Sequence, residues 1–489
     1  MRSDTSSPVA LILGRGRLAD RDVDVAIEGG VIAAIGGPGS LGTPDVDLAG
    51  RWLGAGLWDE HTHFTQWALT SQRLDLSSAT SARDAAAAVA AAIESGAAAE
   101  AGQLVGAGFR DGMWPDAPNL ADLDAAAGGI PVVLVSGDLH CVWLNSAALA
   151  VHGHAGHPTG LLREDAAFEI STTVAAVPDE LGDAWARAAA SAAARRGVVG
   201  IVDLEMSWNL ESWLRRRASG HDALRVEFGI YTQHLQRAID EGLHTGDAID
   251  ELITVGRYKV LTDGSLNTRT AYCYDEYPGL EGQDLSRGML TLPPDELVPL
   301  MRLACDNGIE PDVHAIGDHA NSLVLDAFET VGCHGRVEHA QLLAARDIPR
   351  FAELGVEVSV QPEHLLDDRD VTDRYWPGRT HLAYPFRSLL DAGARLRFGS
   401  DAPVAPLDPW VGIAAAVSRT RGGREPWHPE QRITVGEAFA ASTRSIVAVG
   451  QPADLVATEA DPYAVDADAL RAMPVAATLL GGRFTHTDL

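Results

Sequence analysis

Apolar segments of strand length alternate with alanine-rich helical segments along most of the 489-residue chain. Such alternation is typical of parallel βα units, in which the strands are buried on both faces. Eight segments are candidate strands: 53–60, 198–204, 225–232, 256–262, 309–315, 334–339, 356–361 and 395–400. Because helical segments such as 182–196, 294–307 and 317–330 lie between several of them, the sequence predicts an α/β fold, a (β/α)8 TIM-like barrel.

The two ends of the chain differ from the barrel segments. Short apolar runs punctuated by Gly and Pro occupy residues 8–50, and the similar runs ADLVAT and VAATLLGGRF lie near the other end. We therefore expect residues 1–52 and 449–489 to form one small composite β-sandwich domain beside a barrel at 53–448. This pairing of the two termini is the second element of the predicted fold.

The connection after the first candidate strand is far longer than a βα connection requires. An insertion is therefore predicted at residues 64–190, with strand-like pieces of its own at 103–109 and 131–137. An insertion at this point leaves the barrel at the C-terminal mouth, where barrel active sites are built. We expect it to act as a lid or cap over that site.

The composition restricts the classes of partner. A formal charge of −30 provides no basic field for phosphate backbones or anionic membranes. Four widely spaced cysteines without a C-x-x-C pair are typical of reduced thiols, and the N-terminus carries only a short apolar run, so a cytoplasmic protein is expected. We predict a small-molecule substrate, no nucleic acid and no membrane, and homo-oligomerisation stays open.

The stretch GLWDEHTH begins as a buried strand and ends with two histidines one residue apart. Alternate side chains of a strand share a face, so His61 and His63 converge on one side. Two neutral imidazoles supply half of a coordination sphere for zinc or a similar ion. A pair of hydrogen-bonded core histidines is the alternative explanation, and the choice between the two depends on further ligands.

Further polar residues lie at the ends of four other candidate strands. They are Lys259 in RYKVLTDG, His314 in DVHAIGD, His339 in RVEHAQ and Asp401 after RLRFGS. Each one alone has a structural explanation, such as a lysine that reaches solvent or an aspartate that caps a helix. Together with the H-x-H pair they lie at matching ends of five strands, and this coincidence favours a metal site.

Two other motifs are weaker. Residues 37–42 contain G-x-G-x-x-G, but no helix follows to bind a pyrophosphate, so a turn is expected. The three histidines of VHGHAGHPTG (151–160) lie in a Gly-rich stretch and are interpreted as an exposed loop. The sequence contains no G-x-S-x-G nucleophile elbow of a serine hydrolase.

The sequence resembles the amidohydrolase superfamily, specifically its YtcJ-like amidohydrolase family 3 branch. The resemblance spans nearly the whole chain. It rests on GLWDEHTH, DLHCVWLNSAAL, PTGLLRE, KVLTDGSLNTRTA, DVHAIGDHA, RVEHAQ, SVQPEH, YPFRSLLDAGA, FGSDAPVAPLDP and PADLVA. These motifs are specific for the fold and the metal chemistry and poorly specific for the substrate.

The resemblance implies a centre of one or two divalent metal ions, usually zinc. His61 and His63 would hold one ion with Asp401, and His314 and His339 would hold the second. Lys259 would bridge them as a carboxylated lysine (carbamate), because an ammonium group has no lone pair. If one ion is bound, Lys259 instead stays unmodified and donates a hydrogen bond to the substrate.

The implied activity is hydrolysis of a C–N bond other than a peptide bond in a small amide-type molecule. A divalent ion lowers the pKa of its bound water and supplies hydroxide near neutral pH. Asp401 would take the proton of that water and pass it to the leaving nitrogen, so Asp401 and Lys259 are the expected catalytic residues. A deaminase or cyclic amidase on the same centre is the alternative, and a non-catalytic binding barrel is disfavoured because all expected ligands are present.

Three residues are expected to contact the substrate. His140 and Trp143 lie in DLHCVWLNSAAL, which the resemblance places over the site, and Arg269 lies in KVLTDGSLNTRTA. Trp143 would form an apolar wall, and His140 would bind the substrate carbonyl or its developing oxyanion. The alternative for Trp143 is that it packs the core of the insertion.

Overall fold

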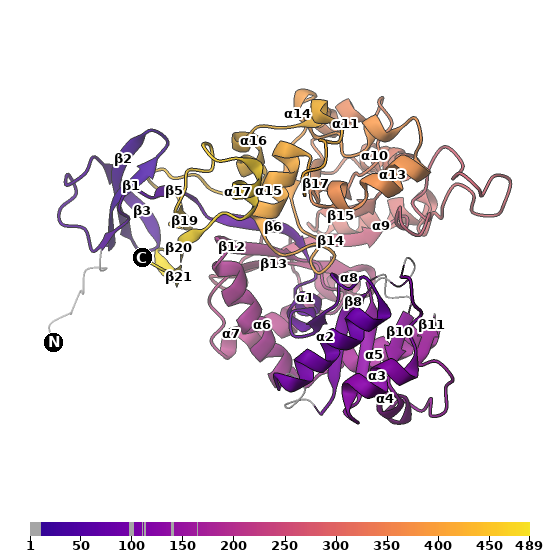
Figure 1. The fold of residues 1–489 in the computed structure, drawn as a ribbon. Helices are drawn as coiled ribbons and strands as arrows, with labels where there is room; N and C mark the ends of the chain where they lie inside the picture. Colours follow the sequence, from indigo (N-terminus) through magenta and orange to yellow (C-terminus); the bar gives the residue numbers. More distant parts are fainter. Residues whose placement is uncertain (1–10, 97–101, 110, 112–113, 138–140, 164) are drawn as a thin grey trace. The chain divides into compact units, whose positions relative to one another are not determined.

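The computed structural model describes residues 11–96, 102–109, 111, 114–137, 141–163 and 165–489. The chain divides into two compact units, of which the first comprises Met1–Phe64 and Ala190–Leu489 and the second comprises Thr65–Ala189. Figure 1 labels the helices and strands of both units.

The first unit contains the predicted barrel. Its eight strands pair in parallel in the order β6, β12, β13, β14, β15, β16, β17, β18. Each expected barrel strand is present, with small shifts at its ends. The bounds are Leu57–Thr62, Val198–Asp203, Arg225–Tyr231, Ile253–Leu261, Pro311–Ala315, Arg336–His339, Glu357–Val360 and Leu396–Phe398.

Backbone hydrogen bonds beyond the regular ladder join the last strand to the first. The N–H of Asp401 donates to the carbonyl of His61 at 2.7 Å, and the N–H of His63 donates to the carbonyl of Ala402 at 2.8 Å. Gly399 permits this approach, since a Cβ at that position would lie 2.5 Å from Cβ of His61. The segment after β18 is thereby held against the H-x-H motif at the C-terminal end of β6.

Helices follow most of the barrel strands. Helix α10 shows how one of them ends. Its C-cap is Gly332, whose φ of 72° is easily adopted by glycine and whose N–H donates to the carbonyl of Phe328. The helices are α7 Asn209–Ala218, α8 Thr232–Asp240, α9 Pro294–Asp306, α10 Asp318–Val331, α11 Ile348–Leu354, α12 His364–Asp367, α13 Arg369–Tyr375, α14 Phe386–Asp391, α15 Pro409–Ser418, α16 Val435–Ala441 and α17 Ala467–Arg471.

Strands from both ends of the chain form a second sheet in the same unit. Its order is β21, β20, β19, β5, β1, β2, β3, and β4 also pairs with β1. The segment expected as one strand at 53–60 is divided, because residues up to Ala55 pair with β1 and β19 and the barrel strand begins at Leu57. The bounds are Leu11–Leu18, Arg21–Glu28, Val31–Gly36, Val46–Asp47, Trp52–Ala55, Leu455–Thr458, Val475–Leu480 and Arg483–Thr487 for β1 to β5 and β19 to β21.

Buried ion pairs connect the early residues of several barrel strands. Arg336, 1% exposed, pairs with Glu60 at 3.0 Å and with Glu357 at 3.2 Å. Burial would raise the pKa of Glu357, but the charges of Arg336, Arg397 and Arg257 outweigh it and lower this pKa to about 2. The carboxylate of Glu357 therefore stays ionised at neutral pH, and its ion pair with Arg336 connects β17 to β16.

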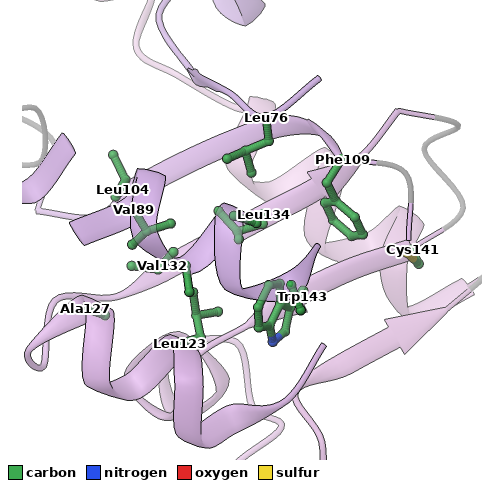
Figure 2. Packing of buried hydrophobic residues seen from close by; sticks show 13 residues of the cluster. Leu76, Val89, Leu104, Phe109, Leu123, Ala127, Val132, Leu134, Cys141 and Trp143 are labelled. Carbon is green, nitrogen blue, oxygen red and sulfur yellow. The ribbon is translucent and has the colours of Figure 1, made fainter. Parts of the chain in front are cut away.

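The second unit is the insertion, and it has a sheet and a core of its own. Its strands run in the order β11, β10, β9, β8, β7, with parallel pairs among the last three and antiparallel pairs among the first three. Figure 2 shows residues such as Leu76, Leu104 and Leu134 packed together in this core. The bounds of its elements are β7 Leu74–Asp75, α2 Ala82–Glu94, β8 Leu104–Phe109, α3 Leu120–Ala127, β9 Val132–Ser136, β10 Cys141–Leu144, α4 Ser146–Val151, β11 Leu161–Arg163 and α5 Asp165–Ala175, with α1 Phe64–Thr70 and α6 Asp179–Ala194 at the unit boundaries.

No helix among the described residues is both long enough and apolar enough to cross a membrane. All four cysteines are free thiols, with Cys141 and Cys273 buried and Cys305 and Cys333 partly buried.

Candidate metal centre

Three predicted ligands converge at the C-terminal ends of the barrel strands. One ligand atom each of His61, His339 and Asp401 lies within 4.8 Å of the other two. His61 lies on β6, His339 ends β16, and Asp401 follows β18. This is the one such group of three among the residues that the structure describes, and its two nitrogens and one oxygen are donors suited to zinc and similar divalent ions.

The second histidine of the H-x-H motif joins the same group through the carboxylate. Oδ1 of Asp401 lies 3.4 Å from Nε2 of His61 and 3.4 Å from Nε2 of His63. The rings of these two histidines are 5.6 Å apart and tilted toward each other. Both imidazoles thus present Nε2 to one carboxylate oxygen, as expected from their position on one face of the strand.

His314, the predicted ligand on β15, lies beside His339. Their ring centroids are 4.4 Å apart in an edge-to-face arrangement. Nε2 of His314 is buried without a hydrogen-bond partner, although Oδ1 of Asp263 lies 3.5 Å away. A buried nitrogen of this kind carries a desolvation cost that a metal ion, or a proton shared with Asp263, would remove.

Lys259 lies on β14 in the barrel interior and is 2% exposed. Its Nζ is buried and has no hydrogen-bond partner. The neighbouring strand places Asp312 opposite Lys259, and both carboxylate oxygens of Asp312 are also without partners. An isolated ammonium is costly in such a setting, so the surroundings of Nζ fit a group that is completed by a ligand or a modification.

Electrostatics separate the histidines from the carboxylate. Burial, strengthened by the charge of Lys259, lowers the pKa of His314 to about 3, and burial holds the pKa of His61 and His339 well below the usual range. Burial opposes ionisation of Asp401, but His61 and His63 outweigh it and hold the pKa of this carboxyl well below its usual range. His63 differs, because burial lowers its pKa but the hydrogen bond and charge of Asp401 outweigh burial and raise it. The other three imidazoles are neutral beside an ionised carboxylate, which are the protonation states in which a metal is bound.

The backbone is strained at two of the predicted ligands. His339 has a φ of 70° and Asp401 a φ of 57°, in the left-handed region that residues other than glycine rarely adopt. Such conformations persist where the surrounding structure enforces them, and they cluster at functional sites. Here they turn the chain at the ends of β16 and β18 so that both side chains reach the group.

Sequence reasoning did not identify three polar residues beside the predicted ligands. Oε2 of Glu338 lies 2.6 Å from Nδ1 of His61, and the amide nitrogen of Gln361 lies 3.2 Å from both atoms. Asp263 accepts hydrogen bonds from the backbone N–H groups of Tyr272, Ile316 and Gly317 beside His314. A carboxylate on the far nitrogen fixes the tautomer of a ligating histidine, and Glu338 is in that position for His61. The polar residues inside RVEHAQ, SVQPEH and KVLTDG were the available signal.

The expected substrate contacts have different outcomes. His140 lies outside the described residues. Trp143 is fully buried in the core of the insertion, where Nε1 donates to the carbonyl of Asn119 at 3.2 Å (Figure 2). This placement favours the packing alternative for Trp143. Arg269 lies in the loop after β14 with its guanidinium 5.5 Å from the ring centroid of Tyr375, and its contact with substrate stays a prediction.

The comparisons with known proteins agree with the geometry. The model of the family described as "Amidohydrolase family" matches residues 46–486. The protein LONG AFTER FAR-RED 3 of Arabidopsis thaliana is 31% identical, over 86% of this chain and 79% of its own. The putative amidohydrolase YtcJ of Bacillus subtilis (strain 168) is 27% identical, over 96% of each.

A solved structure gives the same fold. It is an uncharacterised metal-dependent hydrolase from Pyrococcus horikoshii, with a TM-score of 0.79 and 23% identity, covering 94% of this chain and 99% of its own. The family match begins at β4, after the first three strands of the terminal sheet, and extends through the insertion and the barrel into β21. The chain therefore belongs to the amidohydrolase family.

Proposed function

We propose that this protein is a metal-dependent hydrolase that cleaves a C–N bond, other than a peptide bond, in a small amide-type molecule. The observation that carries the proposal is the convergence of His61, His339 and Asp401 at the mouth of the barrel, with His63 on the same carboxylate oxygen. Membership in the amidohydrolase family supports the class of reaction.

A divalent ion, with zinc as the first candidate, would be held by His61, His63 and Asp401, and a second ion by His314 and His339. The unpartnered Nε2 of His314 and the low pKa of the buried histidines fit this role. When bound, such an ion lowers the pKa of a coordinated water and polarises a substrate carbonyl.

Asp401 is the proposed proton carrier. Its carboxylate is ionised and lies against two imidazoles, so it can accept a proton from the attacking water and release it to the leaving nitrogen. Glu338 keeps Nε2 of His61 free of a proton by accepting the hydrogen of Nδ1. The reaction consumes one water and yields an acid and an amine.

Lys259 is proposed to be carbamylated and to bridge two ions. Burial and the lack of a partner for Nζ support a modified group, because two cations nearby favour the neutral amine that reacts with carbon dioxide. With one ion bound, Lys259 would instead stay unmodified and donate a hydrogen bond to the substrate. The mass of the intact protein under native conditions separates these forms, since a carbamate adds the mass of one carbon dioxide.

The roles of the insertion and the terminal sheet, the location and the partners are also proposed. The insertion is proposed to cover the site with His140 and Arg269 near the substrate, and the terminal sheet is proposed to form a small β-sandwich. A cytoplasmic location, a small-molecule partner, the absence of nucleic-acid and membrane partners, and the oligomeric state are predictions that solution experiments can address.

The test is a substrate panel with the metal as a variable. Linear N-acyl and N-formyl amines, cyclic amides and amino-substituted rings would be incubated with the protein before and after chelation, and amine or ammonia release would be measured. We expect turnover of at least one linear amide, loss after chelation and recovery on adding zinc. Activity confined to rings would assign a cyclic amidase or deaminase instead, and chelator-resistant turnover would contradict the proposed centre.

A further inference from the structure

A fifth histidine lies beside the predicted ligands, and no role has been assigned to it above. His364 follows the seventh barrel strand, β17, as the first residue of the short helix α12. Its ring lies 6.4 Å from the ring of His339, with an angle of 15° between the two planes. It is 9% exposed, and its Nε2 is buried without a hydrogen-bond partner.

The neighbouring side chains of the same segment are already in use. Gln361 contacts His61 and Glu338 on the inner side of the barrel. Glu363 pairs with Arg471 at 2.9 Å and also with Arg421. Nε2 of His364, in contrast, is left without a hydrogen-bond partner. Burying a polar group without such a partner costs about 1–3 kcal/mol of stability, and a bound substrate could supply the partner.

The backbone holds His364 in place. Its N–H donates to the carbonyl of Gln361 at 3.1 Å, and its carbonyl accepts from the N–H of Asp368 at 2.8 Å. The carboxylate of Asp368 in turn accepts from Asn267, Gln341 and Tyr384 at 3.0–3.3 Å. The imidazole is therefore carried on a fixed support rather than on a free loop, as a group that positions a substrate must be.

His364 does not have the geometry of a further ligand. The ring planes of His364 and His339 are nearly parallel, whereas the rings of His61 and His339 are tilted by 56° toward a common point. His364 was not among the predicted ligands, and the metal content of its variants tests directly whether it is one. Its ring thus lies beside that of a predicted ligand, with Nε2 buried and unpartnered.

We propose that His364 contacts the substrate, donating a hydrogen bond from Nε2–H to the oxygen of the group under attack. This inference rests on the proposed function, because it assigns a substrate contact to the same site. The oxygen gains negative charge as water adds to the carbonyl carbon, so a fixed N–H beside it stabilises the transition state more than the ground state.

Two variants of His364 and one control test the contact. His364→Leu removes both nitrogens, whereas His364→Gln keeps an amide N–H near the position of Nε2. His381→Leu is the matched control, because His381 is an exposed histidine in the 3-10 helix Thr380–Leu382. Metal content by elemental analysis and the Kd of acetohydroxamate, a small oxygen ligand of metal hydrolases, by titration calorimetry are read out for each.

We expect full metal content in all three variants. The affinity for acetohydroxamate should fall about 5- to 10-fold in His364→Leu, partly recover in His364→Gln and stay unchanged in His381→Leu. With a substrate from the panel, kcat should fall about 10²- to 10³-fold in His364→Leu with a smaller change in KM.

Three results would overturn the inference. The first is wild-type affinity and wild-type kcat in both His364 variants. The second is loss of metal in His364→Gln, which would make His364 a metal ligand, and the third is a metal-loaded wild type that does not bind acetohydroxamate. The binding arm does not depend on turnover. Failure to find a C–N substrate would therefore contradict the proposed function and leave the contact to be decided by the Kd values. If His364→Leu does not fold, His364→Gln alone is used for both the binding and the kinetic measurements.

Discussion

At the scale of single residues, a carboxylate orients one of the predicted ligand imidazoles. Glu338 lies 2.6 Å from Nδ1 of His61, so Nε2 of the same ring is left to face Asp401. Asp263 stands 3.5 Å from Nε2 of His314. His61 is therefore held in one tautomer, with Nε2 free to act as a donor to a metal ion.

Glu338→Ala should weaken metal binding about 10- to 100-fold, because His61 would lose the acceptor that fixes its tautomer. Glu338→Gln should lose less, since the amide oxygen can still accept from Nδ1–H. The measurement is competition with a chelator of known affinity on the folded protein. Equal metal affinity in wild type and Glu338→Ala would show that Glu338 does not position His61.

The candidate ligands could be predicted from the sequence because each one follows a recognisable strand. His61, His339 and Asp401 were predicted in this way and do converge. Glu338 and Gln361 could not be assigned, because their role depends on which strands face each other across the barrel interior. Trp143 shows the same limit, since an aromatic residue in a site-associated motif can equally pack a local core.

At the scale of elements, the seam between β6 and β18 holds the centre together. Asp401 donates its backbone N–H to His61 across this seam, and Gly399 leaves room for the close approach. A Cβ at Gly399 would lie 2.6 Å from the backbone nitrogen of His61, nearer than real Cβ contacts allow. The geometry of the ligands is therefore coupled to the closure of the barrel.

Gly399→Ala should displace the seam and reduce both metal affinity and stability, the latter by about 1–3 kcal/mol. Gly412→Ala is the control, because its Cβ would meet nothing closer than 3.7 Å and it lies within helix α15. Alanine there should be neutral or slightly stabilising. Denaturant unfolding gives the free energy of unfolding, and elemental analysis gives the metal content. Unchanged metal content in Gly399→Ala would show that metal binding does not depend on the close approach of β18 to β6.

The eight barrel strands were predictable because short segments rich in apolar residues alternate with helical segments, as in parallel βα units, even where a strand such as β16 (RVEH) also carries polar residues. The boundary at the first strand was not. Residues 53–60 appear as a single run, yet Trp52–Ala55 pairs with β1 and β19 and the barrel strand begins at Leu57. The apolar residues of an extended segment do not indicate where it passes from one sheet to another, so this boundary could not be predicted.

At the scale of the whole molecule, the chain combines a barrel unit with an inserted unit that has its own sheet and core. Leu134 is fully buried on β9 of the insertion, and Leu325 is fully buried on α10 of the barrel unit. Separate cores imply that damage to one unit need not spread to the other.

Leu134→Ala should destabilise the insertion by about 2–5 kcal/mol, because it leaves a cavity in that core. Hydrogen exchange should accelerate in peptides from 104–144 while metal content is retained. Leu325→Ala should instead accelerate exchange in peptides of the barrel unit. Equal acceleration in both units for either variant would show that they unfold as one.

The most direct test of the central claim is the metal-to-protein ratio of the purified wild type and of Asp401→Ala after expression with added zinc. We expect at least about one equivalent of a divalent ion in the wild type, because His61, His339 and Asp401 converge at one place. Asp401→Ala should lose most of that metal at unchanged secondary structure. A wild type with less than about a tenth of an equivalent, or a variant that retains the full complement, would contradict the proposed metal centre.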